Sequence, residues 1–253
     1  MSKVIVITGA SAGIGAALAK QLAARGDELM LAARSAKELN QISRACGRGN
    51  YAFTTDVTRR QDVNRLRDEA LRTCENVDVW INNAGRGITR SVMELTDADI
   101  DEMMAVNVKS ALYGMQAIVP HFMERGQGHI INVSSMLGRI PFATFRSAYN
   151  ASKSALNALT ANLRMDLSVD YPKINVSLVM PGAVATGFAA NALYAPVDAG
   201  PMQGAQTVEE VVAVIIDLID NPRPEVYTNP SVQMEQVKSY YSDVAAFEAI
   251  MRQ

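Results

Sequence analysis

The chain has 253 residues, of which 49% are hydrophobic and 20% are charged, values typical of a globular protein with an ample core. Its formal net charge is −2 and it has no dense basic run, which argues against nucleic acid or an anionic membrane surface as its partner. No apolar run approaches the ~18 residues that a membrane-spanning helix requires.

The few cysteines and histidines indicate neither a disulfide nor a metal site. Cys46 and Cys74 fall in segments expected to be helical and share no metal-ligand spacing, and His121 and His129 lie far from any Cys/His cluster. The apolar run at residues 4–7 is followed by glycines and by no cleavage site, so we expect a strand there and no signal peptide. These features fit a reduced chain in the cytoplasm.

A glycine-rich stretch follows the first expected strand and opens the first expected helix. Residues 8–15, TGASAGIG, have the spacing G-x-x-x-G-x-G, and the helix is expected over residues 14–25 with Gly26 as its stop. Glycines let the backbone approach a pyrophosphate, and a helix N-terminus offers free N–H groups and the positive end of its dipole. This context predicts phosphate binding, although a tight turn alone would use the same glycines.

The second expected strand, residues 28–33, leads to Arg34. An NAD-binding unit places an acidic side chain at this point for the ribose 2′-hydroxyl, but here the position holds Ala33 and then Arg34. A guanidinium suits a 2′-phosphate through bidentate contact, so the sequence favours NADP(H) over NAD(H). The alternative is that Arg34 only caps a loop.

Strands and helices continue to alternate along the rest of the chain. Further helices are expected over residues 35–46, 60–74, 96–125 (kinked or in its last turn at Pro120), from Tyr149 onwards and over 208–219, and further strands over 51–54, 77–81, 130–133, 174–180 and 225–227. This order predicts the α/β class: a single-domain Rossmann fold over residues 1–253, with a doubly wound, seven-stranded parallel sheet and helices on both faces. Such a sheet would bring residues 8–9, Arg34, Asp56 and residues 82–85 to one edge, where ligands bind.

The stretch from Tyr149 to Lys153 opens a helix after the strand that ends in Ser134 and Ser135. Residues four apart lie on one helix face, so Lys153 can lie beneath the Tyr149 ring. A phenol titrates near pH ~10, and lowering that pKa to ~7 takes about 4 kcal/mol, roughly what one unit charge at ~4 Å supplies at an effective dielectric of ~20. The pair is a candidate acid/base, the alternative being two ordinary residues of a helix surface.

These motifs occur in an order that resembles the short-chain dehydrogenase/reductase family over residues 4–227. The motifs are TGxxxGxG at residues 8–15, Asp56, Asn82-Asn83-Ala84-Gly85, Asn107, Ser135, Tyr149-x-x-x-Lys153 and Pro181-Gly182-x-Val184-x-Thr186. The resemblance implies an enzyme in which NADPH delivers a hydride to a carbonyl carbon while Tyr149 gives a proton to the carbonyl oxygen. Run backwards, the same site would oxidise a secondary alcohol.

The resemblance also implies which residues bind the cofactor. The glycines would line its phosphates, Asp56 would hold the adenine amine, and Tyr149 and Lys153 would hold the nicotinamide ribose. Residues 83–85 would back the adenosine ribose, and residues 181–186 would fix the nicotinamide ring. Together with Arg34, the residues expected to bind NADP(H) are Gly9, Ser11, Gly13, Ile14, Gly15, Arg34, Asp56, Val57, Asn83, Ala84, Gly85, Tyr149, Lys153, Pro181, Gly182, Val184 and Thr186.

The residues expected to carry the catalysis are Asn107, Ser135, Tyr149 and Lys153. Ser135 would hydrogen-bond the carbonyl oxygen, and Lys153 would lower the pKa of Tyr149. Asn107 would position a water in a proton relay, or would be a helix-kink residue with a satisfied side chain. Ser134 is the rival of Ser135, which is favoured because Gly138, three residues further on, matches a glycine of the family.

The residues expected around the substrate are mostly apolar. Met136, Phe142 and Phe188, with an irregular loop over residues 187–206, would suit a small hydrophobic carbonyl compound or alcohol. An apolar stripe in a helical tail, residues 231–253, could cap the pocket, pack on its own domain or meet a second subunit. The resemblance implies a homodimer or homotetramer.

We therefore expect an NADP(H)-dependent carbonyl reductase or alcohol dehydrogenase without a metal. The alternative enzyme is a 3-oxoacyl thioester reductase acting on a carrier protein or CoA, but the chain lacks the Val-Asp-Gly-Gly ending common in that group. A third hypothesis is a protein that senses NADP(H) without turnover. Such proteins tend to lose the catalytic tyrosine or lysine, and both are present here.

Overall fold

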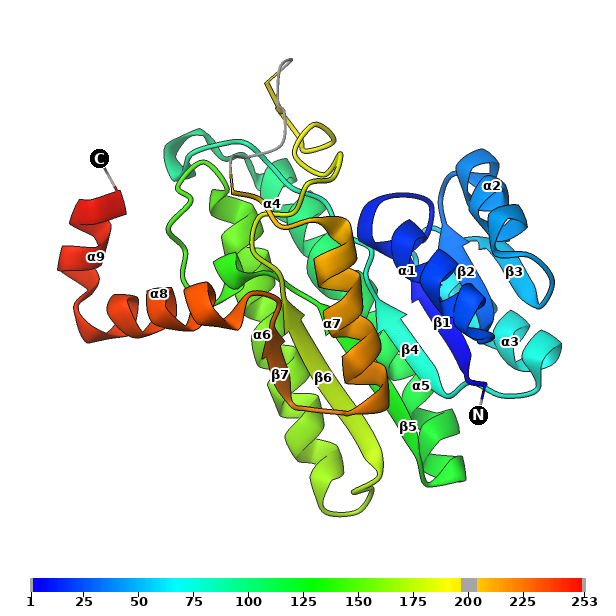
Figure 1. Ribbon diagram of the computed structural model, residues 1–253. Helices are drawn as coiled ribbons and strands as arrows, with labels where there is room; N and C mark the ends of the chain where they lie inside the picture. The colour runs from blue at the N-terminus through cyan, green and yellow to red at the C-terminus, as the bar shows by residue number, and fades with distance from the viewer. Residues whose placement is uncertain (1, 197–203, 252–253) are drawn as a thin grey trace.

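Seven parallel strands form one sheet at the centre of the molecule (Figure 1). The computed structural model describes residues 2–196 and 204–251. The strands are β1 (Val4–Thr8), β2 (Glu28–Ala33), β3 (Asn50–Thr54), β4 (Val79–Asn82), β5 (Gly128–Val133), β6 (Ile174–Met180) and β7 (Glu225–Tyr227). Their order in the sheet is β3-β2-β1-β4-β5-β6-β7. The chain builds the sheet outwards from β1 to β3 and then returns to place β4 on the other side of β1, so the strand order reverses between β1 and β4. The predicted Rossmann-type α/β fold is confirmed.

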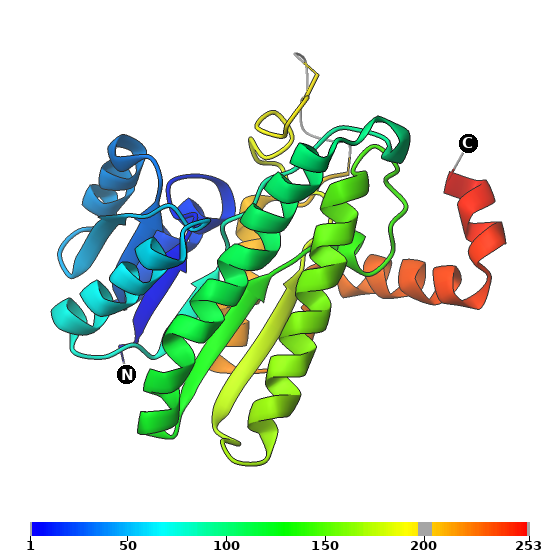
Figure 2. The same cartoon turned by 180° about the vertical axis from the view of Figure 1, so that it is seen from behind.

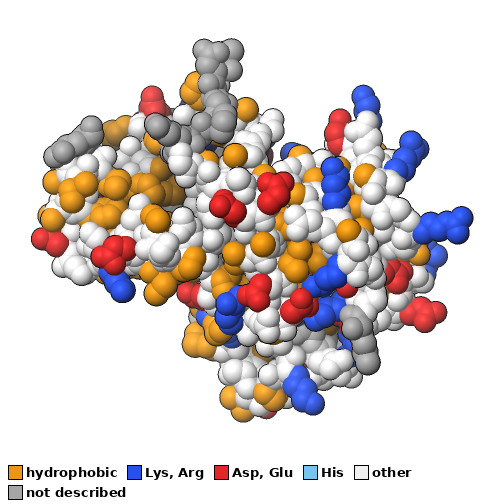
Figure 3. Space-filling view, viewed as in Figure 1, with side chains coloured by type: hydrophobic (Ala, Val, Ile, Leu, Met, Phe, Trp, Pro, Cys, Tyr) orange, Lys and Arg blue, Asp and Glu red, His pale blue; other side chains and the backbone are white. Residues whose placement is uncertain are grey.

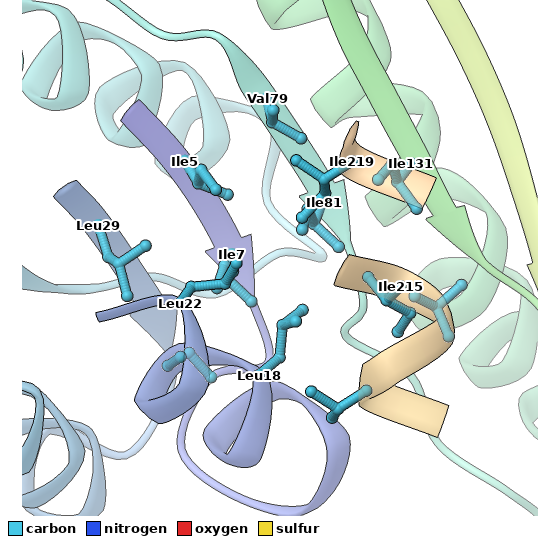
Figure 4. Close-up of a cluster of buried hydrophobic side chains, with 14 of the residues drawn as sticks. Ile5, Ile7, Leu18, Leu22, Leu29, Val79, Ile81, Ile131, Ile215 and Ile219 are labelled. Atoms are coloured by element: carbon cyan, nitrogen blue, oxygen red, sulfur yellow. The ribbon is translucent and has the colours of Figure 1, made fainter. Parts of the chain in front are cut away.

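Helices cover both faces of this sheet (Figures 1 and 2). One face carries α1 (Gly13–Arg25), α2 (Ala36–Cys46) and α7 (Val208–Asp220); the other carries α3 (Arg60–Cys74), α5 (Ser110–Arg125) and α6 (Ser147–Ser168). Successive residues of a strand point to opposite faces, so Ile5 and Ile7 join the core under α1 and α7 (Figure 4), whereas Val6 joins the core on the other face. Within the described residues, every helix is too short or too polar to cross a membrane.

The helix expected over residues 96–125 is divided by a π-helical turn. A capping box between Thr96 and Asp99 starts α4 (Asp97–Met104), η2 (Ala105–Lys109) is π-helical, and α5 follows directly. Pro120 lies inside α5, which continues to Arg125, so Pro120 does not mark the last turn. A π-helical turn re-aims the residues that it contains and is frequent at functional sites. Here it contains Asn107.

Most other predicted elements are present with small shifts at their ends. β4 is the largest difference: residues 79–82 form the strand, whereas residues 77–81 were expected. The predicted stop at Gly26 is confirmed, because this glycine has a φ of 93° and its N–H bonds to carbonyl oxygens of the last turn of α1. End residues shift because fraying and caps, rather than hydrophobic periodicity, set the last turn of an element.

The tail forms two helices, α8 (Pro230–Ser242) and α9 (Val244–Met251), which extend away from the sheet beyond β7 (Figure 1). The side chain of Phe247 is buried against Met136 and Ile140 from the segment after β5. The tail therefore packs on its own domain, one of the three arrangements considered for it. Apolar side chains that remain exposed on this surface (Figure 3) are Val232, Met234, Tyr241, Val244, Ile250 and Met251.

Candidate active site

The carboxyl ends of β1 and β4 are joined by a short network of hydrogen bonds. The Thr8 hydroxyl accepts bonds from the backbone N–H groups of Asn83 (3.0 Å) and Ala84 (3.2 Å). The Asn83 side chain donates in return to the carbonyl oxygens of Thr8 (3.0 Å) and Gly9 (3.3 Å). Because parallel strands end at the same edge, this network brings two of the predicted cofactor motifs into contact.

The glycine turn packs closely against this network. Gly9 has a φ of 68°, and a Cβ added there would lie 2.8 Å from the Cα of Ala84. A Cβ added at Gly15 would lie 2.4 Å from the carbonyl oxygen of Gly9. Both positions therefore require glycine. The first turn of α1 has no acidic residue and no side-chain cap, so its N–H groups remain free for an anion.

Asp56 and Arg34 lie at the same edge, after β3 and β2. The Asp56 carboxylate accepts hydrogen bonds from the Thr58 N–H (3.0 Å) and hydroxyl (2.7 Å) and pairs with Arg59 at 3.7 Å. Burial raises the pKa of Asp56, but these bonds and the charges of Arg34 and Arg59 lower it below its usual value. Arg34 is exposed, and Val57 beside Asp56 is buried.

The loop after β6 faces the glycine turn from the other side. A Cβ added at Gly13 would lie 3.6 Å from the side chain of Thr186, so the predicted motif at residues 181–186 reaches the start of α1. The carbonyl oxygen of Pro181 accepts a bond from the Met136 N–H at 2.8 Å. The loops after β1, β5 and β6 are thus in contact.

The two serines after β5 have different environments. The Ser134 hydroxyl is buried and donates to the side-chain oxygen of Asn157 at 2.5 Å. The Ser135 hydroxyl accepts a bond from the Leu137 N–H at 3.1 Å and is hydrogen-bonded to the Tyr149 hydroxyl. Of the two candidate serines, Ser135 is therefore the one that the structure brings to Tyr149.

Tyr149 and Lys153 are both buried in the first turns of α6. Burial raises the pKa of Tyr149 to about 12, although the hydrogen bond with Ser135 and the charge of Arg146 lower it. Burial lowers the pKa of Lys153 to about 8. The Lys153 ammonium lies 5.7 Å from the centre of the Tyr149 ring and donates to the carbonyl oxygen of Val133 at 3.0 Å.

The prediction that Lys153 holds the pKa of Tyr149 near neutrality is therefore wrong for this structure. Helix spacing alone predicts a lysine charge ~4 Å from the phenol at an effective dielectric of ~20. In the fold, the Lys153 ammonium donates to the carbonyl oxygen of Val133 instead. Burial destabilises the ionised form of Tyr149 more than the nearby hydrogen bond and charge stabilise it, so the pKa of Tyr149 rises.

Asn107, in the π-helical turn, links the loop after β4 to α6. Its side chain accepts a bond from the Arg86 N–H (2.9 Å) and donates to the carbonyl oxygen of Arg86 (2.9 Å) and to the Ser152 hydroxyl (3.1 Å). A Cβ added at Gly85 would lie 3.1 Å from Asn107 and 3.5 Å from the Lys153 ammonium. Asn107 is thus a satisfied residue of a distorted helix, and it also lies beside Lys153.

Only one of the three predicted substrate residues lies against Tyr149. The Phe188 ring meets the Tyr149 ring edge to face, with 5.5 Å between centroids. Met136 and Phe142 instead belong to the cluster around Phe247 of the tail.

Two residues beside Tyr149 were not identified from the sequence. Ile88 packs in the same buried cluster as the Tyr149 ring. Arg146 lies close enough for its charge to lower the pKa of Tyr149. Arg146 is the N-cap residue of α6, three residues before Tyr149, so nearness in the chain was the signal that could have indicated this contact.

Comparisons with known proteins agree with this geometry. A model of the short-chain dehydrogenase family matches residues 3–195. An uncharacterized oxidoreductase of Staphylococcus saprophyticus is 37% identical over 186 residues, which cover 73% of this chain and 75% of the relative.

Solved structures of similar fold contain nicotinamide cofactors. A short-chain dehydrogenase/reductase from Burkholderia phymatum in complex with NAD has a TM-score of 0.87 and 28% identity, covering 97% of this chain and 95% of the other. A short-chain dehydrogenase from Sphingobium yanoikuyae in complex with NADPH has a TM-score of 0.81 and 26% identity, covering 96% and 95%.

Proposed function

The chain belongs to the short-chain dehydrogenase family, and on that premise we propose that it is an NADP(H)-dependent oxidoreductase that interconverts a carbonyl compound and a secondary alcohol. The observation that carries the proposal is the meeting of Ser135, Tyr149 and Lys153 at the edge of the sheet that also holds the glycine turn. Family membership supports an oxidoreductase. The cofactor preference, the direction and the residue roles are proposed.

The residues at the glycine turn fit a dinucleotide. The uncapped first turn of α1 leaves N–H groups for the phosphates, and Gly13, which is exposed, adds no side chain in front of them. Residues 83–85 would hold the adenosine ribose, Asp56 and Val57 the adenine, and residues 181–186 the nicotinamide. When bound there, NADP(H) supplies or accepts the hydride.

Arg34 supports a preference for NADP(H). It is exposed at the carboxyl end of β2, where the chain has Ala33 in place of an acidic residue, and its charge acts on Asp56 of the adjacent loop. A guanidinium at this place can bind a 2′-phosphate bidentately. The similar solved structures contain NAD in one case and NADPH in another, so they do not favour either cofactor. The proposed preference for NADP(H) therefore rests on Arg34 of this chain.

Tyr149 would act as the general acid of carbonyl reduction. With a pKa of about 12 its hydroxyl stays protonated at neutral pH. The hydroxyl gives its proton to the carbonyl oxygen as the carbonyl carbon gains the hydride, and solvent returns a proton to the tyrosinate. A protonated Tyr149 favours reduction over alcohol oxidation.

Ser135 and Lys153 would each stabilise charge that forms during the proton transfer. Ser135, hydrogen-bonded to Tyr149, can also bond the substrate oxygen and stabilise the charge that develops there. Lys153, with a pKa of about 8, is mostly cationic at neutral pH and favours the tyrosinate that forms. Asn107, beside Lys153, would order a water that leads to solvent.

The test is NADPH consumption, followed by absorbance, with a panel of ketones and aldehydes and with acetoacetyl-CoA. Wild type should reduce at least one carbonyl compound, and Tyr149→Phe should lose at least about a thousandfold in kcat because the proton donor is gone. Turnover of acetoacetyl-CoA alone would instead indicate a thioester reductase. Binding of NADPH without any turnover would contradict the proposal and favour a sensing protein.

A fluorescence titration tests the cofactor preference separately. Wild type should bind NADPH at least about tenfold more tightly than NADH, a difference of about 1.4 kcal/mol, and Arg34→Asp should remove that gap. Arg48→Asp, which changes an exposed arginine near the start of β3, is the matched control and should keep the gap. Equal binding of both cofactors by wild type would refute the role of Arg34.

A further inference from the structure

Arg146 immediately precedes α6 and reaches across to the loop after β4. Its Nη1 donates to the carbonyl oxygen of Ile88 and to the hydroxyl of Thr89, both at 3.2 Å. These two bonds fix one end of a partly buried guanidinium. Among residues 2–196 and 204–251, Nε and Nη2 have no hydrogen-bond acceptor, so the side of the fork that binds a carboxylate is free.

The charge of Arg146 is also uncompensated, unlike that of its neighbours. Arg86 pairs with Glu102 at 3.3 Å, and Arg90 pairs with Asp99 at 2.8 Å. No carboxylate in the described part of the chain pairs with Arg146, and burial lowers its pKa. The guanidinium lies over the Phe145 ring, 5.3 Å from its centre, but no anion among the described residues balances its charge. A partly buried cation without an anionic partner is costly for a protein, which suggests that a ligand provides the missing anion.

The guanidinium adjoins the proposed reaction centre. A Cβ added at Gly87 would lie 3.1 Å from Nη1 of Arg146 and 3.0 Å from the Phe188 ring, and that ring contacts Tyr149. The charges of Arg146 and Tyr149 also act on each other's pKa. Arg146 and Phe188 are therefore both packed against Gly87, and Phe188 joins them to Tyr149.

We propose, resting on the proposed function, that Arg146 binds a carboxylate of the substrate, so that the enzyme acts on oxo acids with an apolar body. Nε and Nη2 would each donate to one carboxylate oxygen, which fixes the orientation of the substrate as well as its charge. The carbonyl group would then face Tyr149 and Ser135, and the apolar body would contact Phe188. This narrows the hydrophobic substrate expected from the sequence to an amphipathic one.

A purely structural role for Arg146 makes a different prediction. Its two bonds to the loop after β4 tie that loop to α6, and loss of the tie would disturb the site for every substrate alike. Carboxylate binding, in contrast, affects only substrates that carry the charge. A matched pair of substrates, one acid and one neutral, separates the two roles.

The experiment compares benzoylformate, 3-benzoylpropionate and 4-benzoylbutyrate with their methyl esters, with NADPH in excess. Wild type should favour at least one acid over its ester by about tenfold or more in kcat/KM. Arg146→Gln should lose at least about tenfold on that acid, mainly through KM, and change less than about threefold on the ester. Arg146→Lys should retain part of the preference, because it keeps the charge but not the fork.

Arg90→Gln is the matched control, since Arg90 is the neighbouring arginine that already has a carboxylate partner. It should leave the ratio of acid to ester unchanged. Reduction of neutral carbonyls without any preference for an acid, or an equal loss on acid and ester in Arg146→Gln, would overturn the inference while leaving the proposed function intact. Absence of turnover with every carbonyl compound would refute the proposed function itself.

Discussion

Replacement of Lys153 by methionine should make the cofactor-free protein relatively more stable at low pH than at high pH. Lys153 is buried, with 3% of its surface exposed, and burial lowers its pKa from 10.5 to about 8. Between these two values the unfolded chain holds a proton that the folded protein has lost, so the stability of wild type rises with pH. Below about pH 8 both states are protonated and the full penalty for the buried charge applies.

The expected magnitude follows from this shift. A difference of about 2.5 pKa units corresponds to roughly 3 kcal/mol of penalty at pH 7. About 2 kcal/mol of that penalty is relieved by ~pH 9.5, where the folded protein carries Lys153 mostly neutral. Methionine removes the charge but also leaves the carbonyl oxygen of Val133 without its donor, which costs about 1–3 kcal/mol at any pH. The change of the stability difference between pH 7 and pH 9.5 therefore tests the buried charge better than the difference at either pH alone.

The assay is urea unfolding of wild type and Lys153→Met at about pH 7 and about pH 9.5, followed by the fluorescence of Trp80, the only tryptophan and fully buried. The free energy of unfolding of Lys153→Met minus that of wild type should fall by about 2 kcal/mol between the two pH values. Lys109→Met, which removes an exposed lysine, should show no such fall. A difference independent of pH would refute the reasoning that Lys153 is a costly buried cation.

Three further predictions concern the acid, the glycine turn and the tail. Because burial raises the pKa of Tyr149 to about 12, kcat for alcohol oxidation should rise with pH from about 7 to about 10, while reduction stays level only below about pH 8, where Lys153 keeps its charge; a plateau of the oxidation rate from about pH 8 would contradict this. Gly15→Ala would place a Cβ 2.4 Å from the Gly9 carbonyl oxygen, and the resulting shift of the turn should weaken NADPH binding at least about tenfold in a fluorescence titration. Phe247→Ala should remove the contact of α9 with Met136 and Ile140, lower the unfolding free energy by up to about 3 kcal/mol and speed proteolysis within the tail; unchanged cleavage would argue against this packing.

Local patterns were sufficient to predict the sheet and most of its connections. The run of apolar residues in β1, the glycine turn after it and the stop at Gly26 depend on neighbours in the chain, and each appears as expected. The same holds for the convergence of Thr8 and Asn83 at one edge, since parallel strands with short loops leave little freedom in where their ends meet. The π-helical turn around Asn107 was missed because an extra residue in a helix leaves no clear trace in periodicity.

The choice between Ser134 and Ser135 depends on contacts that sequence spacing does not contain. Both follow β5 directly, and only the position of α6 determines that Ser134 meets Asn157 while Ser135 meets Tyr149. The tail is a similar case: its apolar stripe was visible, but the partner of Phe247 lies in a segment more than a hundred residues earlier.

Chain order and residue type were thus enough to predict the fold, the family resemblance and most of the residues that meet at the site. The protonation and charge pairing of those residues could be determined only from the three-dimensional arrangement. The pKa values of Tyr149 and Lys153 depend on how completely α6 and its neighbours exclude water, and the free edge of Arg146 depends on which carboxylates lie nearby in space. Periodicity and turn chemistry act over a few residues, whereas desolvation and charge pairing sum over every segment that packs around a group.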